Sequence, residues 1–220
     1  MGVLSVSKII ARKLVAMTQS FLHLMVSAEI IRKSELTILQ SNSHKWLEIL
    51  RWQNSSVPDD LYSYITRNLS SSKSQIQQDL FANYIADKLD SNKSKYFVEF
   101  GCTDGLRISN TWLLEKKFGW KGVIAEPARS WHEKLLDNRD CNIELSCVYQ
   151  ESGKLLKFLE SQEPEFSTLD QYEKGDEHER VISDSYLVPT ISLNDLLEKY
   201  DAPKRISFLS IDTEGVNMRF

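Results

Sequence analysis

The first part of the chain carries apolar residues at helical spacing. Steps of three and four between residues 10 and 31 place one apolar set on a single helix face. The set is Ile10, Leu14, Met17, Phe21, Leu24, Ala28 and Ile31. This helix either packs on its own domain or forms a short coiled-coil seam, through which the protein would self-associate. Residues 44–52 and 59–69 predict two more short helices, the second beginning after Pro58.

The pattern changes after a small, polar stretch at residues 68–74, "NLSSSKS", which is typical of a linker. It predicts a helical N-terminal region, residues 1–73, and a second domain, residues 74–220. In the second domain, helical and strand-like segments alternate. The helices are expected at 75–89, 109–118, 129–139 and 192–200, and the strands at 96–101, 121–127, 142–149 and 206–215. This alternation predicts an α/β fold, a parallel sheet with helices on both faces.

Two details of this pattern need the structure to test them. The helix at 75–89 is expected to bury the side that carries Ile76, Leu80, Tyr84 and Ile85. The long polar stretch 150–187 shows no strong period, and we expect it to line or cover the site where an acceptor binds.

Composition and charge narrow the functional classes. The net charge is −4, which argues against nucleic-acid binding because that usually needs a basic face. Three cysteines without a C-x-x-C pair suggest neither a disulfide framework nor a zinc site, so a reducing, cytoplasmic compartment is expected. No apolar run is long enough for a membrane span. Residues 14–28 share some features of a signal peptide, but polar residues interrupt their apolar core.

Acidic residues recur where the predicted strands end. The strand ends read "EFGCTDG", "AEP" and "DTEG". In an open parallel sheet, ligands bind at the carboxyl ends of the strands. The acids at this edge are Glu99, Asp104, Glu126, Asp212 and Glu214.

An acidic edge suits a cationic ligand better than a phosphate. The first loop lacks a complete Gly-x-Gly-x-x-Gly pattern, and Asp104 would repel a pyrophosphate, which weakens the case for a nicotinamide-dependent oxidoreductase. S-adenosylmethionine carries a sulfonium and an ammonium and no phosphate. Gly101 and Gly105 would let the chain turn tightly beside it. Glu99 or Asp104 could meet the ammonium, and Glu126 could accept both ribose hydroxyls.

Several long segments resemble one known family. The run "SNTWLLEKKFGWKGVIAEPARSWHEKL" (109–135), together with "FVEFGCTDG", "VPTISLNDLLEKYDAP" and "FLSIDTEG", is similar to FkbM-type S-adenosylmethionine-dependent methyltransferases. The resemblance covers residues 73–215. It implies a Rossmann-like methyltransferase fold and O-methylation of a hydroxyl on a sugar, glycan or related natural product.

The resemblance also assigns roles to individual positions. It places Gly101, Asp104 and Gly105 in the cofactor loop, Ser109 and Asn110 at the start of the next helix, and Glu126 at the ribose. The acid pair after the fourth strand is Asp212 and Glu214. The segment "SQIQQDLF" (74–81) matches the opening motif of the family, except that Gln77 stands where glycine is usual.

The chain departs from the family after "DTEG". The family continues with Ser-Glu, an apolar helix and further strands, whereas this chain reads "VNMRF" and ends. We therefore expect a domain that is truncated at its C-terminus, with the fourth strand at an edge or covered by the N-terminal helices. A catalytically inactive binding or assembly module, with residues 1–67 as its partner surface, is the alternative to an active enzyme.

Methylation of an alcohol needs a general base near the acceptor oxygen. Asp212 is the first candidate, Glu214 the second and His132 the third, although Asp212 could instead hold the cofactor or a metal ion. No divalent-ion cage is apparent in the sequence, so no metal is expected. Two further expectations concern packing: Cys102 is a small residue that fits its loop, and the tryptophans 112, 120 and 131 pack helices against the sheet.

Overall fold

The structure, a computed structural model, describes residues 58–90, 93–173 and 179–213. The chain divides into two compact units, residues 1–70 and 71–220, and each is described by itself. The helices predicted at 10–31 and 44–52, and the candidate base Glu214, lie outside the described residues. Within the described part, no helix has the length and apolar character to cross a membrane.

The described part of the first unit is helical. Helix α3 (Asp59–Asn68) begins directly after Pro58, as predicted, and a short 3-10 helix, η1 (Leu69–Ser71), follows it. Two aspartates, Asp59 and Asp60, lie in the first turn of α3, where the positive end of the helix dipole favours negative charge.

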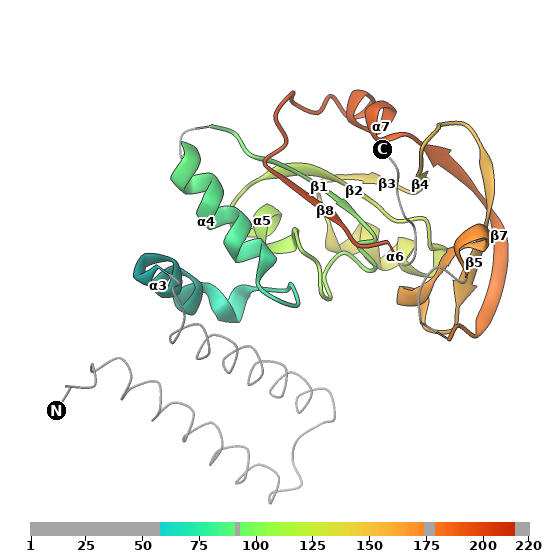
Figure 1. The fold of residues 1–220 in the computed structure, drawn as a ribbon, viewed down its shortest axis with the longest axis horizontal. Helices are drawn as coiled ribbons and strands as arrows, with labels where there is room; N and C mark the ends of the chain where they lie inside the picture. Colours follow the sequence, from blue (N-terminus) through green and yellow to red (C-terminus); the bar gives the residue numbers. More distant parts are fainter. Residues whose placement is uncertain (1–57, 91–92, 174–178, 214–220) are drawn as a thin grey trace, which may run out of the picture. The chain divides into compact units, whose positions relative to one another are not determined.

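The second unit is built on a parallel sheet (Figure 1). Its strands lie in the order β3-β2-β1-β8. They are β1 (Tyr96–Phe100), β2 (Lys121–Ala125), β3 (Asn142–Glu144) and β8 (Phe208–Ile211). All three neighbouring pairs are parallel, which confirms the predicted parallel sheet. The third strand is shorter than predicted because the chain turns after Glu144. The backbone N–H of Ser146 donates to the Glu144 carboxylate at 2.9 Å.

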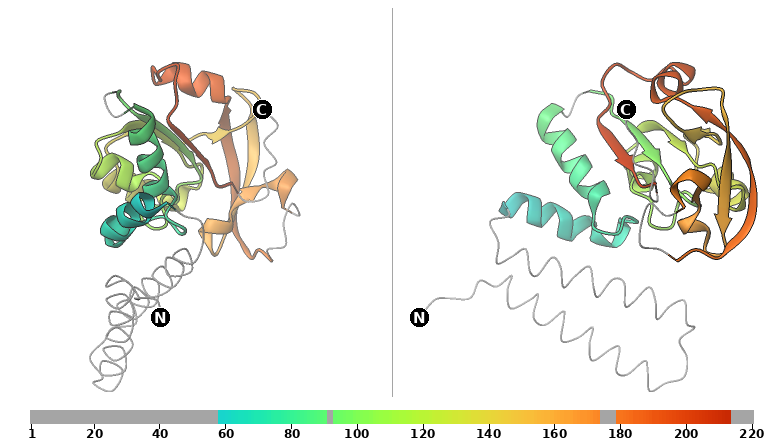
Figure 2. Two further views of the ribbon diagram at one scale, coloured as in Figure 1. Left: turned by 60° about the vertical axis from the view of Figure 1, so that its left-hand side comes forward. Right: turned by 45° about the vertical axis from the view of Figure 1, so that its right-hand side comes forward.

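Both faces of this sheet are covered, as the alternation predicted. On one face, Val98 and Phe100 pack with Leu196 of α7 (Leu193–Lys199). On the other, Phe97 and Ile124 pack against three helices. These are α4 (Gln78–Asp90), α5 (Trp112–Lys116) and α6 (Arg129–Asn138) (Figure 2). Alternate residues of β1 therefore pack into the cores on opposite faces of the sheet.

The buried side of α4 differs from the prediction. Leu80 is fully buried, but Ile76 is 68% and Ile85 37% exposed. Two polar residues, Asp79 and Asn83, are buried instead because each has hydrogen-bond partners. Asp79 accepts bonds from the hydroxyls of Ser72 and Ser74, both at 2.7 Å, and Asn83 accepts one from the Trp120 indole at 3.0 Å. Satisfied polar groups can be buried at little cost, so the apolar pattern alone predicted the buried side only in part.

Gln77 precedes α4 in an unusual conformation. Its φ is 63°, in the left-handed region that favours glycine, and only 2% of its surface is exposed. The preference of the family for glycine at this position therefore has a backbone cause.

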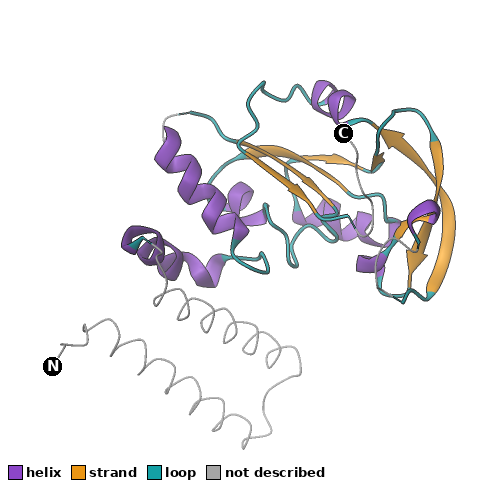
Figure 3. Ribbon diagram, viewed as in Figure 1, coloured by secondary structure: helices purple, strands orange, loops and turns teal. Residues whose placement is uncertain are grey.

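The stretch 150–187 forms most of a second sheet, which its sequence pattern did not predict (Figure 3). Its strands lie in the order β4-β7-β5-β6. They are β4 (Cys147–Val148), β5 (Leu155–Ser161), β6 (Thr168–Leu169) and β7 (Ile182–Ile191). The short helices η2 (Pro164–Phe166) and η3 (Asp170–Tyr172) flank β6. Strand β5 buries a continuous run at its end that includes Glu160, so the usual alternation of apolar and polar residues is absent.

Candidate functional site

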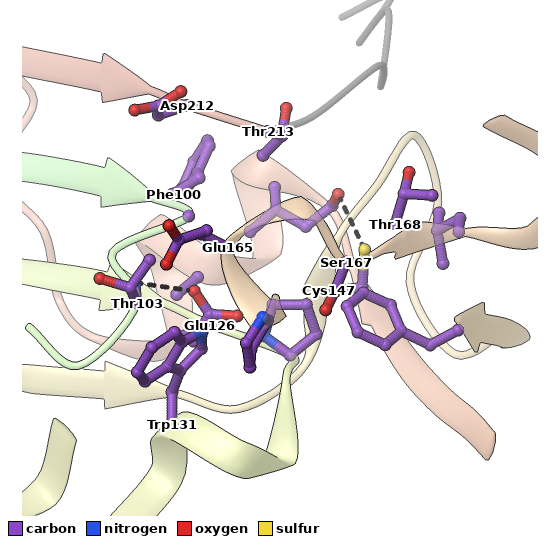
Figure 4. Close-up of a pocket in the computed structure, with 17 residues that line it drawn as sticks. Phe100, Thr103, Glu126, Trp131, Cys147, Glu165, Ser167, Thr168, Asp212 and Thr213 are labelled. Atoms are coloured by element: carbon purple, nitrogen blue, oxygen red, sulfur yellow. Dashed lines mark hydrogen bonds between the residues drawn. The ribbon is translucent and has the colours of Figure 1, made fainter. Parts of the chain in front are cut away.

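A cavity lies where β1, β2 and β8 reach their carboxyl ends (Figure 4). One wall comes from these strand ends and the opposite wall from the second sheet. The strand ends and the start of α6 contribute Phe100, Gly101, Thr103, Ala125, Glu126, Pro127, Trp131, Asp212 and Thr213. The second sheet and η2 contribute Cys147, Val148, Phe158, Pro164, Glu165, Ser167, Thr168 and Leu169. The chain order reverses between β1 and β8, so the cavity is at the topological switch point of the sheet.

Gly101 lets the ends of β1 and β8 approach each other. Its φ is +70°, and a Cβ added there would lie 1.8 Å from the carbonyl oxygen of Asp212. The neighbouring backbone is fixed on both sides. The N–H of Gly101 donates to Ala125 at 3.1 Å, and the N–H of Asp212 donates to Phe100 at 3.1 Å. A glycine is therefore required for Asp212 to reach the cavity wall in this position.

Glu126 is a buried carboxylate in the cavity wall. Its Oε2 accepts the backbone N–H of Thr103 and its Oε1 that of Ala128, both at 2.9 Å. Burial raises the pKa of Glu126 from 4.5 to about 7, although the two backbone hydrogen bonds act in the opposite direction. The group therefore exists in two charge states near neutral pH.

This raised pKa predicts a pH dependence of stability. Between pH 4.5 and 7 the folded protein holds a proton on Glu126 that the unfolded chain has released, so stability falls as pH rises through this range. The loss attributable to Glu126 should approach about 3 kcal/mol above pH 8. Urea unfolding of wild type and Glu126→Gln at pH 5, 7 and 8.5 measures it. As pH rises, the free energy of unfolding of wild type should fall relative to that of the variant. A difference that stays constant with pH would contradict the raised pKa.

Glu99 does not line the cavity, since its carboxylate is used inside the protein. It accepts hydrogen bonds from Ser109 Oγ at 3.1 Å, the Asn110 backbone N–H at 2.7 Å and Thr111 Oγ1 at 2.6 Å. Asn110 donates its side-chain amide to Ser210 Oγ at 2.9 Å. Glu99 therefore holds the segment that leads into α5.

Asp104 and Gly105 shape the loop after β1. Asp104 Oδ1 accepts the backbone N–H groups of Leu106 at 3.0 Å and Arg107 at 2.7 Å, as in an Asx turn. Gly105 has φ +74°, and an added Cβ would lie 2.6 Å from Leu135. Of the nine residues assigned from the sequence, the structure thus brings Gly101, Glu126 and Asp212 together in the cavity wall, places five elsewhere and leaves Glu214 undescribed.

Arg139 is a residue that the sequence did not single out. Its side chain is fully buried and forms ion pairs with Glu99, at 3.6 Å, and with Glu115. It also donates to the carbonyl of Gly105 at 3.2 Å and to Thr111 Oγ1 at 2.9 Å. Arg139 therefore ties the end of α6 to the loop between β1 and α5. Its partners lie far away in sequence, so no local motif marks it.

Other predictions concern the surroundings of the cavity. Cys102 is buried, as expected of a small residue that fits, and burial raises the pKa of its thiol well above the usual value. His132 does not line the cavity; its Nε2 lies 3.0 Å from the backbone oxygen of Glu126. Trp120 packs in the core as predicted, whereas Trp131 lines the cavity.

The charge of the cavity wall is negative. Glu126, Glu165 and Asp212 line it, and among the residues that the structure describes no lysine, arginine or histidine does. Arg107 pairs with Glu165 at 3.1 Å from outside the wall. Within the described ranges, no three His, Cys, Asp or Glu side chains are arranged to hold a metal ion. The wall is thus suited to a ligand with positive charge.

The parallel sheet with helices on both faces and a cavity at its switch point defines a Rossmann-like fold. A model of one family, described as the methyltransferase FkbM domain, matches residues 92–219, more than half of the chain. The chain therefore belongs to the FkbM methyltransferase family, which confirms the resemblance seen in the sequence. Neither a curated protein nor a solved structure was found to match it.

Proposed function

We propose that the protein is an S-adenosylmethionine-dependent methyltransferase that acts on a hydroxyl oxygen of a sugar, glycan or related small molecule. The observation that carries this proposal is the position of Glu126. Its buried carboxylate lies in the cavity wall at the end of β2, held by a backbone N–H of the β1 loop. An acid at the end of the second strand can accept hydrogen bonds from ribose hydroxyls.

The residues present fit the proposed methyl donor. The described part of the wall carries three acids and no basic side chain, which disfavours a phosphate and favours a sulfonium. Each Glu126 oxygen accepts one backbone hydrogen bond, which leaves acceptor capacity for ligand hydroxyls. At Gly101 the backbone is bare of a side chain, so a ligand can approach it closely.

The chain would contribute positioning, exclusion of water and a base. S-adenosylmethionine, when bound, supplies a methyl group on a positively charged sulfur. Phe100 and Phe158 give the cavity apolar surface that excludes water from part of it. Asp212 is exposed at the edge of the wall, where it would accept the proton of the acceptor hydroxyl and pass it to solvent.

Isothermal titration with S-adenosylmethionine at pH 8 tests the proposal. Saturable binding is expected, and Glu126→Ala should weaken it at least tenfold, since two ribose hydroxyls lose their acceptor. Glu133→Gln, which changes an exposed acid on α6, serves as the matched control and should bind like wild type. Because the ionised carboxylate is the better acceptor, wild-type affinity should rise about tenfold between pH 6 and pH 8.

The reaction itself needs a second measurement. Transfer of labelled methyl to a panel of sugar and glycan hydroxyls should be detectable, and Asp212→Asn should slow it without changing the affinity for the methyl donor. Absence of binding at millimolar ligand would overturn the proposal. Binding without transfer to any acceptor would instead favour a binding or assembly module.

A further inference from the structure

Trp131 lines the cavity and carries an indole N–H that is not used inside the protein. Its Nε1 is buried and has no hydrogen-bond partner among the residues that the structure describes. A buried tryptophan N–H usually finds an acceptor, because leaving it unpaired is destabilising. In the described ranges, the other buried side-chain atoms without a partner are Tyr96 Oη and Asn110 Oδ1, and both residues lie outside the cavity wall. The acceptor for Trp131 can therefore come from a ligand.

The local backbone fixes Trp131 beside Glu126. The N–H of Trp131 donates to the Ala128 carbonyl at 3.1 Å, and the N–H of Ala128 donates to the Glu126 carboxylate at 2.9 Å. One turn at the start of α6 thus sets the position of both side chains. The indole also packs against the apolar cluster that contains Ala128 and Phe158. Figure 4 shows the indole next to Glu126 on the same side of the cavity.

A carboxylate and an N–H side by side favour a ligand group that both donates and accepts a hydrogen bond. An ammonium would bond to Glu126 but leave Trp131 without an acceptor. A phosphate would accept from Trp131 but be repelled by Glu126. A hydroxyl satisfies both, because it donates one hydrogen bond and accepts another.

We propose that Glu126 and Trp131 together form a hydroxyl-binding pair. In this pair a ligand hydroxyl donates to the Glu126 carboxylate and accepts from the Trp131 N–H. The inference rests on the proposed function, in which the hydroxyl belongs to the ribose of the methyl donor. It assigns Trp131 to ligand binding, whereas its sequence pattern indicated packing only.

Trp131→Phe tests the pair because phenylalanine keeps an aromatic ring and removes the N–H. Titration with S-adenosylhomocysteine should show affinity about five- to tenfold weaker than wild type. With 2′-deoxy and 3′-deoxy analogues, the variant and wild type should bind equally to the analogue that lacks the paired hydroxyl. Trp112→Phe, on α5 and outside the cavity wall, is the matched control and should leave all affinities unchanged.

A second readout keeps the test independent of variant folding. In wild type, the indole N–H resonance of Trp131 should move downfield when S-adenosylhomocysteine binds, and should not move with the analogue that lacks the paired hydroxyl. If wild type binds but Trp131→Phe binds equally well and the resonance stays in place, the pair is overturned and the proposed function stands. If wild type does not bind the nucleoside at all, the proposed function fails and the pair fails with it.

Discussion

Replacement of Gly101 by alanine is expected to lower the free energy of unfolding by about 3–5 kcal/mol. Two penalties add in this variant. Alanine would have to adopt a φ of +70°, and its Cβ would lie 1.8 Å from the backbone oxygen of Asp212. The oxygen belongs to the main chain and cannot rotate away, so relief requires β8 to separate from β1. The same shift would move Asp212 out of the cavity wall, so the proposed methyl transfer should fall as well.

Gly119→Ala provides the matched control. Gly119 has φ +68°, almost the same as Gly101, but an added Cβ there meets nothing within 4 Å. This variant should carry only the conformational penalty, about 1–2 kcal/mol. Urea unfolding of the two variants separates the conformational penalty from the steric penalty. Equal losses would mean that the ends of β1 and β8 are not in the close contact described above.

The central sheet could be predicted because its signals are local. The strands β1, β2 and β8 are mostly apolar and are followed by turn residues, and α7 begins at a Ser192 cap. The second sheet lacks such signals. Strand β5 pairs with β7 along most of its length, and Glu160 is buried there because the Tyr186 hydroxyl donates to it. The burial of such a residue depends on a partner that lies far along the chain.

The candidate site was predictable only in part for a related reason. Strand topology brings Gly101, Glu126 and Asp212 to one edge, and the sequence shows where strands end. It does not show which way a side chain turns. Glu99 and Phe100 are neighbours on β1, but only Phe100 lines the cavity. The Glu99 carboxylate pairs with Arg139 inside the protein. Which partner the carboxylate contacts depends on tertiary packing, and the spacing of residues in the sequence does not show it.

The variant Arg139→Leu is expected to lose about 3–5 kcal/mol of stability, because it leaves the buried Glu99 carboxylate without its cation and Glu115 with Lys116 alone, 3.7 Å away. The side chains of Glu99 and Glu115 are 2% and 8% exposed, and both are paired with Arg139. Leucine keeps apolar volume at the site but provides neither charge nor donors. Gly105 and Thr111 would also lose their bonds from the guanidinium, so the loop after β1 should become less ordered.

Neutralising the acids should recover much of this loss. The triple variant Arg139→Leu, Glu99→Gln, Glu115→Gln contains no unpaired buried charge, so it should be more stable than Arg139→Leu alone even though it carries more substitutions. Arg205→Leu, which removes an exposed arginine, should change stability by less than about 0.5 kcal/mol. Denaturant unfolding at pH 8 compares the four proteins. If the triple variant is less stable than the single one, Arg139 acts through its hydrogen bonds to the loop, and the burial of the two carboxylates is not what makes it necessary.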